Sequence, residues 1–165
     1  LGRIGVAYME WAGAHFQRTV IDWTLINDAE SAKQFITRLA DVPPTTQRWT
    51  SISGAMDYAM KLFAQSPFEG TRRAIDISGD GSNNNGRPSH MARDEAIAAG
   101  ININGLPILA VEPNLEGYFR DNVIGGPGAF AIPAATFEDF GAAILRKLIL
   151  ETDNHLDHSR RLLLE

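Results

Sequence analysis

The sequence predicts a single α/β domain in which helices cover both faces of a mostly parallel sheet. Two observations support this fold class. Short apolar segments alternate along the chain with longer amphipathic segments, an order typical of doubly wound, Rossmann-like sheets. The length of 165 residues suits one ordinary domain, and no repeat or linker divides it.

The composition excludes several classes of function. Acidic residues outnumber basic ones by 20 to 15, and no basic stripe is present to bind phosphates, which argues against a nucleic-acid partner. The absence of cysteine excludes disulfides, thiol catalysis and cysteine metal sites. No apolar run approaches the roughly 20 residues that span a bilayer.

The N-terminal third predicts a β-hairpin followed by a helix. Residues 4–11 form an apolar run typical of a buried strand, and residues 18–25 alternate as its antiparallel edge partner. Asn27, with Glu30 three residues later, is the expected N-cap of the helix. Its apolar stripe comprises Ala32, Phe35, Ile36 and Leu39.

The remainder predicts alternating helices and strands. We expect a helix from Ile52 to the residue before Ser66, strands at 73–77, 101–104 and 129–132, a helix from Pro88 to Gly100, a helix at 114–122, and a last helix capped by Thr136 and Asp139. Residues 1–151 then form the domain, and residues 152–165 form a polar, irregular tail.

Two loops carry the predicted chemistry. Thr50 begins a hydroxyl-rich helix start, and Asp80 stands between glycines directly after a strand. Ligands of such sheets bind at the carboxyl ends of the strands, so both loops belong to one rim. A hydroxyl and a carboxylate suit Mg²⁺, Ca²⁺ or Mn²⁺, although further oxygens from water or a ligand are needed.

Other polar residues near this rim are open to two interpretations. They form a partner-binding rim, or they are helix N-caps, turn residues and packing residues. The set consists of Ser51, Ser53, Ser78, Asn83, Asn84, Glu10 and Trp11. Asp76, in a strand expected to be buried on both faces, is either a satisfied structural carboxylate or a support for the metal loop. No phosphate loop, EF-hand or hydrolase elbow matches.

Three segments carry a resemblance to a known family. They are residues 48–55, 72–84 and 123–130, with residues 8–13 and 104–108 adding to it. Together they resemble a von Willebrand factor A (VWA) domain from a bacterial branch of unknown function, over residues 2–151.

The resemblance implies a metal-ion-dependent adhesion site with one part missing. The threonine of the family's second loop corresponds to Thr50, and the aspartate of its third loop corresponds to Asp80. The first-loop Asp-x-Ser-x-Ser motif has no counterpart, since the family's first strand and helix would precede Leu1. That strand is central, and its absence would open a gap of roughly 9–10 Å. We therefore expect a fragment, a gap filled by a second chain through oligomerisation or strand exchange, or a rearranged sheet.

For function, the resemblance implies a protein-binding module and no catalysis. A divalent cation, first of all Mg²⁺, would keep one coordination position open for an acidic side chain of a protein partner, with incomplete affinity in this chain. The alternatives are a Mg²⁺-assisted hydrolase, which needs a general base near Asp80, and a structural domain without metal. The resemblance also favours a periplasmic or otherwise extracytoplasmic location.

Overall fold

A computed structural model describes residues 2–43 and 47–161 of the chain. The order of elements is mixed α/β, as predicted. It runs β1 (Ile4–Trp11), β2 (Gln17–Ile26), α1 (Ala29–Ala40), α2 (Ile52–Ala64), β3 (Arg73–Gly79), α3 (Ser89–Ala98), β4 (Ile101–Pro107), α4 (Leu115–Asn122) and α5 (Phe140–Arg161). Within the described ranges, no helix has the length and apolar character required to cross a membrane.

The predicted hairpin is confirmed, but the expectation of a buried first strand is wrong, since no residue of β1 is buried. β1 and β2 pair antiparallel, from Ile4 opposite Ile26 to Trp11 opposite Gln17, with register shifts between Val6 and Met9. The turn closes through a hydrogen bond from the Ala12 amide to the Phe16 carbonyl, at 3.0 Å. This hairpin places the end of β1 beside the segment that leads into α2.

The second pair of strands is parallel, as expected for strands joined by a crossover helix. β3 and β4 align from Arg73 opposite Ile101 to Gly79 opposite Pro107. The predicted strand at residues 129–132 is reduced to isolated bridges, such as the parallel bridge between Gly105 and Ala131. Prolines on both sides of this segment, at positions 127 and 133, cannot donate to a longer ladder.

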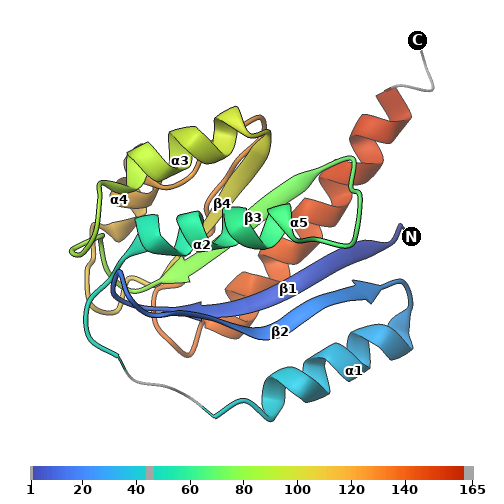
Figure 1. The fold of residues 1–165 in the computed structure, drawn as a ribbon, viewed down its shortest axis with the longest axis horizontal. Helices are drawn as coiled ribbons and strands as arrows, with labels where there is room; N and C mark the ends of the chain where they lie inside the picture. The colour runs from blue at the N-terminus through green and yellow to red at the C-terminus, as the bar shows by residue number, and fades with distance from the viewer. Residues whose placement is uncertain (1, 44–46, 162–165) are drawn as a thin grey trace.

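The two pairs form separate two-stranded sheets. In Figure 1, β1 and β3 run in the same direction, and the part of the chain that the structure describes contains no strand between them. Their carboxyl ends meet, because the Trp11 ring lies 3.3 Å from the position a Cβ would take on Gly79. An α/β architecture with one parallel and one antiparallel pair is thus established, whereas one continuous doubly wound sheet stays a prediction.

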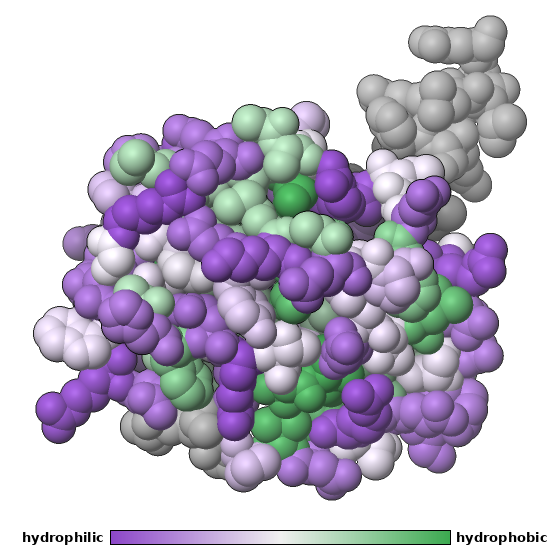
Figure 2. Space-filling model, in the orientation of Figure 1, coloured by the Kyte–Doolittle hydropathy of each residue, from purple (hydrophilic) through white to green (hydrophobic). Residues whose placement is uncertain are grey.

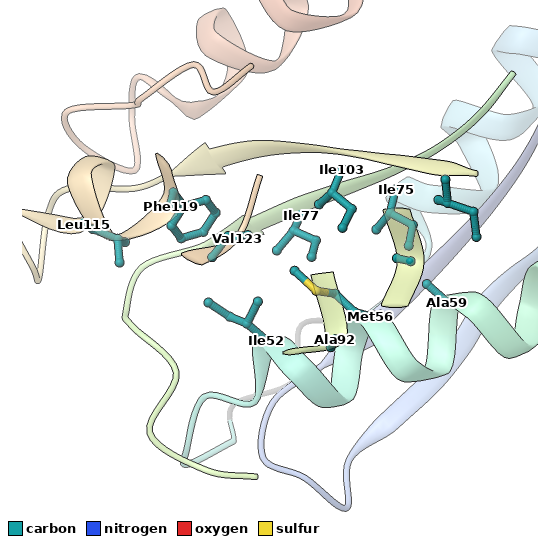
Figure 3. Close-up of a cluster of buried hydrophobic side chains, with 12 residues drawn as sticks. Ile52, Met56, Ala59, Ile75, Ile77, Ala92, Ile103, Leu115, Phe119 and Val123 are labelled. Atoms are coloured by element: carbon teal, nitrogen blue, oxygen red, sulfur yellow. The ribbon is translucent and has the colours of Figure 1, made fainter. Parts of the chain in front are cut away.

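The main core lies between the parallel pair and helices α2, α3 and α4. Ile52 and Met56 of α2 point toward Ile75 and Ile77 of β3 (Figure 3), and all four are buried. Full burial of such a side chain stabilises the fold by about 1.5–3 kcal/mol. Gly105 admits α4, since a Cβ there would lie 2.6 Å from the Phe119 ring.

Helix α5 covers the opposite face of the parallel pair. Leu106 and Ile108 pack there against Ala134 and Ala143. The visible outer surface is largely hydrophilic, with smaller apolar areas between the polar side chains (Figure 2). α5 continues to Arg161 and so includes residues 152–161 of the predicted polar tail. Helix formers such as Leu148 and Glu151 extend the helix without any breaker.

Helix α1 differs from the prediction in two respects. Its N-cap is Asp28, not Asn27, and the capping partner is Ser31, whose amide donates to the Asp28 carboxylate at 2.7 Å. No residue of α1 is buried, and Ile36 of the expected apolar stripe is 64% exposed. The helix lies along β2, away from the main core, so Ala32, Phe35 and Leu39 of the stripe are only partly buried.

Candidate metal and partner site

Three loops meet at the carboxyl ends of β1 and β3. They are the β1–β2 turn, the segment before α2 and the β3–α3 loop. The Ser51 amide donates to the Ala12 carbonyl at 2.6 Å, which joins the first two. The Thr50 Oγ1 atom lies 3.6 Å from the position a Cβ would take on Gly81, which joins the second to the third. The hydroxyl of Thr50 therefore faces the backbone next to Asp80.

Asn84 and Asn85 hold the Thr50 backbone from both sides. The Thr50 amide donates to Asn84 Oδ1 at 2.8 Å, and the Thr50 carbonyl accepts from the amides of Asn84 and Asn85 at 2.9 and 3.1 Å. Both backbone polar groups of Thr50 are thereby used. Its hydroxyl makes no hydrogen bond to any other described residue, which leaves it available to an added ligand.

The flanking asparagines tie the same loop to two further segments. Asn83 Oδ1 accepts from the Ser53 amide at 3.2 Å, and Asn83 Nδ2 donates to the Arg87 carbonyl at 3.1 Å. Asn85 Oδ1 accepts from the Ala14 amide at 2.6 Å. These asparagines therefore do more than form a turn, because their side chains also bind neighbouring segments. The sequence shows the run of three asparagines, but it does not show which segments their side chains bind.

Ser51 and Ser53 lie inside the loop cluster. Ser51 is the N-cap of α2 and accepts from the Gly54 amide at 3.2 Å, which confirms that interpretation. Both side chains are buried, at 0% and 1% exposure, so direct contact with a partner would require the loops to move. Gly86, at a φ of 84°, passes so close that a Cβ would lie 2.8 Å from Ser51 Oγ.

Asp80 is exposed and makes no hydrogen bond or ion pair within the described part of the chain. A second carboxylate approaches from the β4–α4 loop, where Glu112 Oε2 accepts from the Ser82 amide at 2.8 Å. Sequence reasoning missed Glu112, because it belongs to neither predicted loop. No group of three or more His, Asp or Glu side chains suited to a metal occurs among the described residues. A cation at Thr50 and Asp80 would therefore need further oxygens from elsewhere.

The remaining predicted rim residues surround this point. Glu10 accepts two hydrogen bonds from Arg18, at 3.0 and 2.7 Å. Trp11 is partly buried against the core and Gly79, so its side chain packs between the ends of β1 and β3. Ser78 is half-buried at the end of β3.

Trp49 was not predicted as a site residue, yet it directly precedes Thr50 and is 65% exposed. Its φ is 72°, the left-handed region, and among the described residues every other positive φ belongs to glycine. That conformation costs a residue with a Cβ about 1–2 kcal/mol. The hydrogen bonds that join Thr50 to Asn84 and Asn85 hold the adjoining backbone in place.

A family model described as "Protein of unknown function (DUF1194)" matches residues 1–156. The chain belongs to the DUF1194 family. A search among curated proteins found no match. The family assignment agrees with the resemblance to a VWA branch of unknown function.

Solved structures with the same fold support the VWA type. Proximal thread matrix protein 1 from the mussel byssus has a TM-score of 0.62 at 16% identity, over 88% of this chain and 35% of its own. BatB from Bacteroides thetaiotaomicron has a TM-score of 0.61 at 20% identity, over 90% of this chain and 80% of its own. A further structure of the mussel protein, described as having a zinc-occupied MIDAS motif, has a TM-score of 0.59 at 13% identity, over 87% of this chain and 34% of its own. This DUF1194 chain thus spans about a third of the mussel protein, and the likeness establishes a VWA-type fold.

Proposed function

We propose that this DUF1194 domain is a protein-binding module whose ligand is anchored through a divalent cation at Thr50 and Asp80. The observation that carries the proposal is the contact between the two loops, with Thr50 Oγ1 3.6 Å from the Cβ position of Gly81. A hydroxyl and a free carboxylate are hard oxygen donors of the kind that Mg²⁺ and Mn²⁺ prefer.

The donor set fits such an ion in part. Thr50 Oγ1 and the Asp80 carboxylate are both without a hydrogen bond from the described residues, and a carboxylate in the loop that Thr50 Oγ1 faces would attract a cation. Two protein ligands leave the remaining positions to water and to an Asp or Glu of the partner. The mussel protein of the same fold is described with zinc in its MIDAS motif, which supports a cation at this rim.

A peptide selection tests the proposal. The chain is immobilised and panned with a random peptide library on phage, once with Mn²⁺ and once with EDTA. We expect peptides that contain Asp or Glu, that bind only with Mn²⁺, and whose affinity falls at least about tenfold in Asp80→Ala and Thr50→Val, because each change removes one cation ligand.

Two matched variants serve as controls. Asp121→Ala removes an exposed carboxylate at the end of α4, and Thr37→Val removes an exposed hydroxyl in α1; both should bind the peptides like the parent chain. Peptides that bind equally in EDTA would overturn the proposal. Turnover of phosphoesters or peptides with Mg²⁺, lost in Asp80→Ala, would instead favour a hydrolase.

A further inference from the structure

The most exposed aromatic side chain at the rim sits on strained backbone. Trp49 is 65% exposed, and its φ of 72° is one that side chains with a Cβ rarely adopt. Such outliers persist only where the surrounding structure enforces them, and they gather at functional sites. A glycine would relieve the strain at this position, yet the chain places its bulkiest residue type there.

The hydrogen bonds of the next residue, Thr50, hold the backbone of Trp49 in this conformation. Thr50 is held by Asn84 through an amide hydrogen bond of 2.8 Å and by the reciprocal bond of 2.9 Å to its carbonyl. On the other side, the Trp49 Cβ lies 3.2 Å from the Cβ position of Gly13, in the β1–β2 turn. The backbone and Cβ of Trp49 are therefore held next to the candidate cation ligand, and its side chain is exposed to solvent.

The charges beside Trp49 indicate what would contact it. Arg48, directly before it, is exposed, and Thr50, directly after it, faces the loop of Asp80. A cation at Thr50 and the guanidinium of Arg48 would place positive charge on both sides of an apolar indole. Aromatic side chains with this combination of area and rigidity commonly dominate protein interfaces.

We infer that Trp49 is the apolar anchor of the partner interface and that it selects an acidic segment carrying an apolar residue beside the carboxylate that reaches the cation. This inference rests on the proposed function, and it names the chemistry of the partner. The Asn84–Thr50 hydrogen bonds act as the positioning device that keeps the indole at the rim.

The peptides recovered with Mn²⁺ test the inference. Trp49→Ala and Trp49→Gly both remove the indole, and each should weaken the selected peptides at least about tenfold while Mn²⁺ dependence persists. A library panned on Trp49→Gly should still yield acidic peptides but should lose the apolar neighbour. Asn84→Ala should weaken binding although the indole is present. The control Ile36→Ala removes an equally exposed apolar side chain, at 64%, and should bind normally.

A thermal measurement tests the strain without any partner. Because glycine suits a φ of 72° and alanine does not, Trp49→Gly should melt about 2–4 °C above Trp49→Ala. Cation-dependent peptides that bind Trp49→Ala as tightly as the parent chain would overturn this inference while leaving the proposed function intact. An absence of any Mn²⁺-dependent peptide would overturn both, and a melting point of Trp49→Gly at or below that of Trp49→Ala would overturn the enforced conformation.

Discussion

The charged side chain of Lys147 in α5 is buried between that helix and the parallel strand pair. It is 1% exposed, pairs with the carboxylate of Asp76, and lies 2.9 Å from Glu151. Asn104 Nδ2 donates to Glu151 at 2.6 Å. Asp76 is thus a satisfied structural carboxylate, one of the two predicted alternatives. The prediction that its strand is buried on both faces is wrong, because the Asp76 side chain is 39% exposed next to the open edge of β3.

This cluster gives folding a pH dependence. Burial raises the pKa of Asp76 to about 6, against the opposing effect of the Lys147 ammonium and with a contribution from Glu151. Between about pH 4 and 6 the folded chain therefore holds a proton that the unfolded chain has released. Stability falls as the pH rises through this window. The pKa of Glu151 is lowered, mainly by hydrogen bonds from its neighbours against the cost of burial, so its effect has the opposite sign and lies at lower pH.

Asp76→Asn should remove this dependence. From pH 5 to pH 7 the parent chain should lose about 1 kcal/mol of unfolding free energy more than the variant, after allowance for solvent screening of a carboxylate that is 39% exposed. Urea unfolding of both proteins across that range measures the difference. Parallel pH profiles would show that Asp76 does not hold the proton.

Residues of the site differ in how far the sequence could predict them. Thr50 and Asp80 could be named, because the pattern of apolar residues places one before a helix and the other after a strand, and the family resemblance marks both as cation ligands. Trp49 and Glu112 could not. Backbone strain at Trp49 has no sign in the sequence, and Glu112 reaches Ser82 only through tertiary folding.

At the scale of single elements, β3 has the most unusual setting. One edge pairs with β4 along its length, and the other has no backbone partner among the residues that the structure describes. Ile75 and Ile77 are buried against the helices, while Ala74 and Asp76 on the opposite face are exposed. The strand is therefore held by one edge and one face.

Hydrogen exchange should show this asymmetry directly. In a parallel ladder, alternate amides of β3 donate to β4, and the others point to the open edge. NMR-detected exchange should therefore find alternating protected and fast-exchanging amides along β3. Uniform protection would contradict an open edge and would indicate that a further strand, such as one from a second copy, occupies it.

Element boundaries followed local signals, and the errors have local causes. α2 begins at Ile52, where the hydroxyl cap of Ser51 precedes an apolar stripe that fills the core. α1 has a similar stripe that faces β2, but none of its residues is fully buried, since burial depends on what lies opposite and not on periodicity alone. Residues 129–132 have strand-like composition, yet the prolines on either side limit them to bridges.

At the scale of the whole molecule, the chain of strands and helices forms a VWA-type fold from two separate sheets. The alternation of elements predicted the class, and the hairpin predicted the antiparallel pair. The separation between β1 and β3 could be expected only from the family resemblance. The apolar pattern of a strand does not say which other strand pairs with each of its edges. The rim still assembles, since Trp11 bridges to Gly79 and the asparagines bind the loops together.

Paramagnetic NMR with Mn²⁺ tests whether Thr50 and Asp80 share one divalent cation. Substoichiometric Mn²⁺ should broaden the amide signals of Thr50 and Gly81 together and spare those of α1, which lies beyond β2. In Asp80→Ala both signals should persist at the same Mn²⁺ concentration. Absence of broadening in the parent chain, or broadening in Thr50→Val as strong as in the parent chain, would contradict the shared site.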